Sequence, residues 1–174
     1  MTHLAALPVA VPFLAASLLV AVGAFAPRWL NDSVAAGCGV SVLAIGALLA
    51  HRAVTGPFAY WVGGWRPSRG VAIGISLSID PLGAGMATFA TLMVVAAFAY
   101  SLHYFDAVAG LFHSLMLLFM AAMAGFSLTG DLFDMIVFFE LMSAVAYGLT
   151  AYRIEERAPI QGAINFAITN SIGG

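Results

Sequence analysis

The 174-residue sequence contains no lysine, and charged residues of every kind make up only 8% of it. An average soluble domain has about 25% charged residues. The net charge is −2, so the chain offers no basic surface of the kind that binds nucleic acid. A single cysteine, Cys38, excludes an intrachain disulfide. No set of His, Cys or carboxylate residues has metal-ligand spacing, and we expect no metal, no other cofactor and no catalytic site.

Apolar residues fill the chain instead, at 63% of the sequence, and the mean hydropathy is +1.02. A helix that crosses a bilayer needs about 20 such residues. We therefore predict an all-α polytopic membrane protein with about six transmembrane helices, forming one membrane domain over residues 1–174, in the cell membrane. The expected spans are 7–26, 34–50, 82–101, 108–127, 131–151 and a sixth that begins near 160.

Two polar segments are expected outside the bilayer, a short turn at 27–33 and a longer loop at 51–80. Apolar and small or polar residues alternate strictly over 71–79, as in a half-buried strand. With the aromatic stretch around Tyr60 as its partner, this strand predicts a short surface β-hairpin that covers helix ends. The Asp80-Pro pair that follows is typical of a helix start.

Glu140 interrupts the apolar middle of the fifth predicted span. It lies nine residues after Asp131, which at a rise of 1.5 Å per residue is roughly 14 Å, near the midplane of a ~30 Å hydrocarbon core. A carboxylate at that depth costs roughly 2–4 kcal/mol on insertion scales, so it indicates a functional site by default. Two interpretations stay open: a protonated, hydrogen-bonded carboxylic acid, or a proton or cation relay tuned by burial and a partner charge.

Weaker candidates for ion translocation surround Glu140. Asp131 and Asp134 share the first turn of the same helix, where they are expected to cap it or to form a mouth that collects cations. Ser143 and Tyr147 follow Glu140 on or near its face and either hydrogen-bond a water chain or pack in the core. His113, alone in the fourth span, is either a packing residue or a relay.

The sixth segment carries a polar stripe. Gln161, Asn165 and Thr169 recur every four residues on an otherwise apolar helix. Such a stripe faces protein or water rather than lipid. It is either a hydration path toward Glu140 or a packing surface.

Three motifs carry a resemblance: Thr129-Gly-Asp-Leu-Phe-Asp134, then Phe138-Phe-Glu-Leu-Met142 with its tail to Tyr147, and the Tyr60 to Trp65 loop that leads into Ile79-Asp-Pro-Leu82. Together they resemble the antiporter-like proton-translocating subunits of respiratory complex I, of multisubunit Na+/H+ antiporters and of membrane-bound hydrogenases. The resemblance covers the chain as roughly the N-terminal third of a member.

The resemblance implies about fourteen helices with two inverted five-helix repeats, each with a broken helix. It matches Glu140 to the family's essential fifth-helix glutamate, whose partner lysine lies on a later helix outside this chain. Two positions depart from the family: many members carry Lys where this chain has Asn165, and antiporter members usually carry Asn at the position of Asp134. The chain also ends about fourteen residues into its sixth apolar segment, short of the ~20 of a span, and we expect it to be part of a longer protein.

These observations predict an ion-translocating subunit, moving protons or exchanging Na+ for protons, that works through Glu140. Its expected partners are the bilayer and other membrane subunits of an NADH:quinone oxidoreductase, hydrogenase or antiporter complex; the chain alone is expected to catalyse nothing. Two alternatives belong to other classes. One is a structural or assembly subunit that transports nothing, and the other is an intramembrane enzyme that uses Glu140 with His113.

Overall fold

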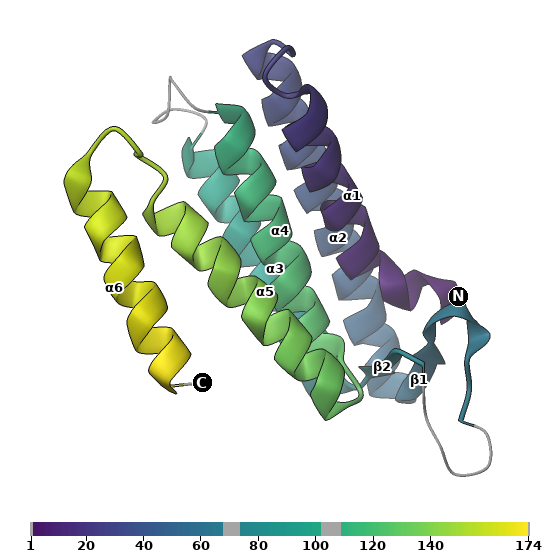
Figure 1. The fold of residues 1–174 in the computed structure, drawn as a ribbon. Coiled ribbons are helices and arrows are strands. Elements are labelled where there is room, and N and C mark those ends of the chain that lie inside the picture. Colours follow the sequence, from purple (N-terminus) through teal and green to yellow (C-terminus); the bar gives the residue numbers. More distant parts are fainter. Residues whose placement is uncertain (1, 68–73, 102–108, 174) are drawn as a thin grey trace.

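The computed structural model describes residues 2–67, 74–101 and 109–173. These residues form long α-helices and one small antiparallel sheet (Figure 1). In chain order the elements are α1 (Leu7–Val22), α2 (Arg28–Thr55), β1 (Phe58–Trp61), β2 (Ser76–Ile79), α3 (Pro81–Ser101), α4 (Ala109–Leu128), α5 (Leu132–Thr150) and α6 (Arg157–Gly173), with 3-10 turns at Thr2–Ala6 and Val62–Gly64.

Five helical segments among the described residues are long and apolar enough to cross a membrane: His3–Val22, Arg28–Thr55, Pro81–Ser101, Gly110–Leu128 and Leu132–Thr150. The sixth predicted helix is present as α6, whose 17 residues fall short of the ~20 of a typical span. The predicted all-α membrane architecture with a small hairpin is therefore confirmed. The expected link at 102–106 lies outside the described residues.

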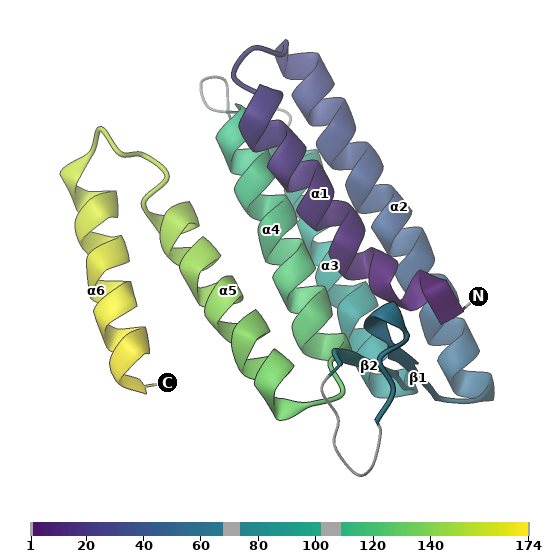
Figure 2. The same cartoon turned by 45° about the vertical axis from the view of Figure 1, so that its right-hand side comes forward.

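The first four helices form a bundle in which α4 packs against α1, α2 and α3. On its other side α4 contacts α5, and α5 in turn contacts α6. Both views of the ribbon show α6 as the outermost helix, separated from the bundle by α5 (Figures 1 and 2). The helices α1–α4 thus pack on one another as a bundle, whereas α5 and α6 form an outer pair on one side of it.

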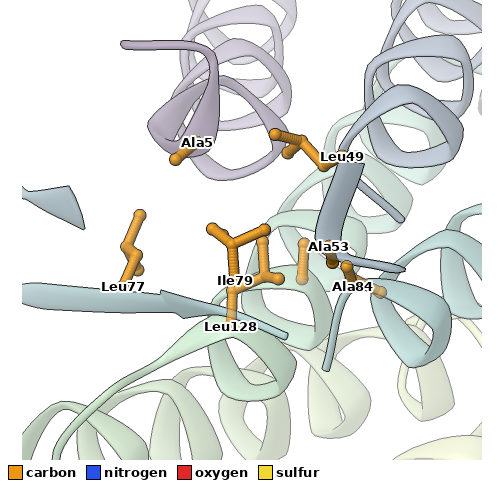
Figure 3. Close-up of a cluster of buried hydrophobic side chains, with 9 residues drawn as sticks. Ala5, Leu49, Ala53, Leu77, Ile79, Ala84 and Leu128 are labelled. Carbon is orange, nitrogen blue, oxygen red and sulfur yellow. The ribbon is translucent and has the colours of Figure 1, made fainter. Parts of the chain in front are cut away.

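Small side chains allow the bundle helices to approach closely, as is common where helices pack in a bilayer. At Gly46 of α2 a Cβ atom would lie 2.9 Å from the hydroxyl oxygen of Thr88 on α3. The core has two parts. The part near the hairpin is drawn in Figure 3 and consists of Ala5, Leu49, Ala53, Leu77, Ile79, Ala84, Ala87, Ala124 and Leu128. The part toward the other end contains Ala16, Leu19, Ala35, Cys38, Val42, Val94, Phe98, Leu117 and Met120.

The predicted polar turn at 27–33 is wrong, because the chain reverses at residues 23–27 and α2 begins already at Arg28. The polar residues of this segment stabilise the first turns of the helix rather than a loop. Arg28 and Asp32 form an i,i+4 ion pair with a 3.6 Å separation. The side-chain amide of Asn31 donates to the carbonyl oxygen of Gly23 at 3.0 Å and holds the turn against the helix.

The hairpin forms as predicted, with Phe58 opposite Ile79 and Trp61 opposite Ser76. The expected burial of alternate residues holds for Leu77 and Ile79, which are 2% and 0% exposed. Ser76 departs from it and is also buried, because the start of α5 covers it. Residues 71–73 of the predicted strand lie outside the described residues, and α2 extends to Thr55, so that the first five residues of the predicted loop are helical.

Candidate functional site

The start of α5 is built by Asp131, which is the N-cap of the helix. Its Oδ1 accepts a hydrogen bond from the backbone N–H of Asp134 at 2.8 Å, the geometry in which a capping carboxylate satisfies a free helical donor. This hydrogen bond, with those from the Asp134 side chain and Ser76, lowers the pKa of Asp131 below its ordinary value, although partial burial opposes the shift. The capping role predicted for this residue is confirmed.

Backbone and side-chain hydrogen bonds join the hairpin to the start of α5. The backbone N–H of Gly130 donates to the carbonyl oxygen of Ser76 at 2.8 Å, and Leu77 forms a β-bridge with Thr129. The hydroxyl of Ser76 donates to Oδ2 of Asp131 at 3.4 Å. A Cβ atom at Gly130 would lie 2.6 Å from that hydroxyl oxygen, so this close approach needs glycine.

Glu140 lies in the middle of α5, on the side that no other described helix covers. The neighbours one and two turns before it on that face, Phe133, Ile136 and Val137, are 76%, 60% and 49% exposed. Among the described residues, no hydrogen bond or ion pair involves the Glu140 carboxylate. An unpaired carboxylate at this depth needs protein or water around it, since lipid would exact the cost of a buried charge.

One and two turns beyond Glu140, α5 joins α6 through a polar cluster of Ser143, Tyr147 and Asn170. The amide nitrogen of Asn170 lies 3.1 Å from the Ser143 hydroxyl oxygen and 2.8 Å from the Tyr147 hydroxyl oxygen, and it donates to both. The Tyr147 ring meets Phe166 edge-on, with 5.2 Å between centroids. The sequence placed Ser143 and Tyr147 near the Glu140 face correctly, but it did not single out Asn170.

The predicted polar stripe of α6 faces elsewhere. Gln161, Asn165 and Thr169 are all exposed, and the Thr169 hydroxyl donates to the backbone carbonyl of Asn165 at 2.8 Å. No hydrogen bond among the described residues joins Asn165 to Glu140. In the structure the contacting side of α6 is marked by Ala163, the one buried residue described on this helix. It lies seven residues before Asn170 and therefore on the same side, but its burial cannot be read from the sequence.

His113 of α4 is buried, and its ring stacks on Phe98 with centroids 5.5 Å apart. Its Nε2 lies 3.2 Å from Oδ1 of Asp32 on α2, a contact that becomes a charge pair when the imidazole is protonated. The sequence analysis treated His113 as solitary. It missed the partner because it assigned Asp32 to a loop.

The described residues contain no group of three or more His, Cys, Asp or Glu side chains that could hold a metal ion. The candidate ionisable residues occupy three separate places: the capped start of α5, the open middle of α5, and the α2–α4 interface near the opposite end of the bundle. Apolar spans with an ionisable side chain at mid-depth define this molecule as a multi-pass membrane protein with a candidate ion site.

Known proteins of two kinds are similar in sequence. The chain is 40% identical over 119 residues to NADH-quinone oxidoreductase subunit N of Desulforudis audaxviator. It is 33% identical over 153 residues to a probable K+/H+ antiporter subunit of Rhizobium meliloti. The matches cover 65% and 84% of this chain but 23% and 28% of those proteins, so the chain spans about a quarter of their length. No family model matches the chain.

Solved structures agree with these relatives. A chain of the membrane-bound sulfane sulfur reductase, an archaeal respiratory membrane complex, superimposes with a TM-score of 0.81 at 24% identity, over 97% of this chain and 34% of that one. A chain of the Mrp complex from Dietzia sp. DQ12-45-1b gives a TM-score of 0.76 at 31% identity, over 86% and 28%. The chain belongs to the family of antiporter-like membrane subunits.

Proposed function

We propose that this chain is part of an ion-translocating subunit in which Glu140 takes up and releases a proton as the ion crosses the membrane. The observation that carries the proposal is the position of Glu140, an ionisable group at mid-depth of an apolar span, on the uncovered face of α5. A buried carboxyl group changes its proton affinity strongly with its surroundings, which suits it to a relay.

A relay of this kind needs a paired charge whose approach and withdrawal switch the proton affinity of the carboxyl group. The chain contains no lysine, and no described arginine pairs with Glu140. The paired cation would therefore come from outside the described residues, on protein that covers the open face of α5. The names of the relatives support a role within a larger assembly: one is a subunit of an NADH-quinone oxidoreductase and the other a subunit of a probable K+/H+ antiporter. The proposed setting is the cell membrane, with other membrane subunits as partners and H+ or Na+ as the transported ion.

Ser143, Tyr147 and Asn170 fit the same proposal as a polar route beside Glu140. Hydroxyl groups both donate and accept hydrogen bonds, so they can hold ordered water or pass a proton along a chain. Asn170 ties both hydroxyl groups to α6. Any movement of α6 against α5 would change the hydrogen bonding one turn from the carboxyl group.

The test is Glu140→Gln in the full-length protein, assembled in its complex and measured as cation-driven proton movement in inside-out vesicles. Glutamine keeps the shape but cannot release a proton, so transport should fall by at least about tenfold, the low end for loss of a proton-transfer group. The matched control is Glu155→Gln in the exposed turn before α6, which should transport normally. Unchanged transport in an assembled Glu140→Gln complex would refute the relay and favour the structural alternative.

A further inference from the structure

A cavity of about 670 Å³ lies between the hairpin and the start of α5. Its lining comprises Trp61, Gly74, Ile75, Ser76, Gly130, Asp131, Phe133, Asp134 and Val137. The only titratable side chains among these lining residues are the two aspartates. Among the described lining residues, the hairpin side contributes the Ser76 hydroxyl and no charged side chain, so the described lining has a polar, acidic end on α5 and an apolar, aromatic remainder.

Asp134 gives the cavity a carboxylate oxygen, Oδ2, that no described hydrogen bond uses. The residue is 8% exposed, and its Oδ2 is buried without a hydrogen-bond partner. An uncompensated carboxylate oxygen that is kept from water is costly unless a proton or a cation accompanies it. The capping role cannot account for Asp134, because the cap uses its backbone N–H and the side chain of Asp131.

The two carboxyl groups lie within hydrogen-bonding reach of each other. Two carboxylates this close repel each other, so a proton or an added cation between them stabilises the pair. No ion pair among the described residues supplies such a cation to either group. The N-terminal end of the α5 dipole favours the ionised form but adds only partial positive charge.

We infer that this cavity is a binding site for a monovalent metal cation, held between the carboxylate oxygens of Asp131 and Asp134 and the hydroxyl oxygen of Ser76. Oxygen ligands suit hard cations. The site in its proton-bound form carries one carboxylate and one carboxylic acid. Binding of the cation displaces the shared proton to water, so one positive charge enters as one leaves and the net charge of the site is unchanged.

The small number of oxygen ligands favours a monovalent over a divalent ion. Ca2+, for example, takes six to eight oxygen ligands, several of them from carboxylates, and the described lining residues include no third acidic side chain. The exchange of one cation for one proton also predicts competition. The apparent affinity for the cation falls as the pH falls, because protons compete for the same pair of carboxyl groups.

The test uses the purified full-length complex in a weakly buffered solution with a pH indicator. Glu140→Gln is the background, so that the relay cannot contribute and failure of this site is distinguished from failure of the proposed function. Addition of NaCl or KCl, but not of choline chloride at equal ionic strength, should release up to one proton per protein and raise the midpoint of thermal unfolding. CaCl2 serves as the divalent probe.

Asp134→Asn in this background should abolish the metal-dependent proton release. Ser76→Ala keeps both carboxyl groups and loses one neutral ligand, so it should weaken the apparent affinity by about two- to tenfold. Glu155→Gln should behave as the background does. Equal responses to choline and to the metal ions, proton release that survives Asp134→Asn, or a response to Ca2+ alone would each overturn the inference.

Discussion

The four-helix bundle α1–α4 and the outer pair α5–α6 use similar apolar sequences in opposite ways. Half of the most apolar window of α4 is buried within the chain, against 17% of that of α5. Each of these two helices carries an ionisable side chain among apolar neighbours, His113 in α4 and Glu140 in α5. His113 is stacked and paired, whereas Glu140 has no partner among the described residues.

This contrast teaches that an ionisable residue in an apolar helix is not in itself a functional signal. The α4 histidine is part of the contact between two packed helices, because its partner Asp32 lies on α2, which packs against α4. The α5 glutamate lies on a face that the rest of the chain leaves open. The deciding property is whether the fold supplies a partner, and that property depends on packing between distant segments.

The largest expected effect is on stability and compares a buried leucine of the bundle core with an exposed one. Leu117 of α4 is 0% exposed and Leu14 of α1 is 68% exposed. Leu117→Ala should destabilise the full-length protein by about 2–5 kcal/mol through the lost contacts and the cavity left behind, while Leu14→Ala should cost less than about 1 kcal/mol. Denaturant titration in detergent measures both. Equal losses would mean that α4 is no more central than the lipid-facing side of α1.

The two ionisable sites can be separated by Asp32→Asn, which removes the charge that faces His113. Loss of the contact with buried His113 and of the ion pair with Arg28 should cost about 1–3 kcal/mol of stability and leave transport per folded complex unchanged. Glu140→Gln should instead reduce transport and leave the stability of the protein nearly unchanged. The matched control is Glu156→Gln, whose exposed pair with Arg153 should contribute less than about 1 kcal/mol. Lost transport with intact stability in Asp32→Asn would make the α2–α4 contact part of the ion route.

The smallest expected effect concerns the hydrogen bonds that join α6 to α5. Asn170→Ala removes both hydrogen bonds between α6 and α5, worth about 0.5–1.5 kcal/mol each. We expect a partial loss of transport, of about two- to tenfold, with little change in the unfolding of α1–α4. Asn165→Ala on the exposed face is the control and should transport as the unsubstituted protein does. If Asn165→Ala has the larger effect, the exposed stripe of α6 is the polar route.

Local signals in the sequence predicted most of the fold. The Asp80-Pro start of α3 holds, because Oδ1 of Asp80 accepts from the N–H groups of Leu82 and Gly83 at 2.9 Å. The hairpin and the Asp131 cap hold for the same reason: partners within a few residues or in an adjacent strand leave a mark in the local pattern. Glu140 could be singled out because one charge in an apolar run is visible without any structure.

What the sequence could not predict depends on contacts between helices. The 27–33 segment is polar enough to read as a loop, yet its ion pair and the contact of Asp32 with His113 make it the start of α2. Asn170 was overlooked because a four-residue period describes one helix and does not say which face a neighbour covers. The cavity under the hairpin joins residues more than fifty positions apart, and no local pattern reports such a distance.

The packing of α1 against α4 has a consequence for biosynthesis. About a hundred residues separate the end of α1 from the end of α4, and transmembrane helices insert before they associate. The α4-facing side of α1 therefore meets lipid or the insertion machinery until most of this segment has been translated. Pro8 and Pro12 are buried on α1 in the folded chain. The α4-facing side of α1 becomes covered only after α4 has been inserted.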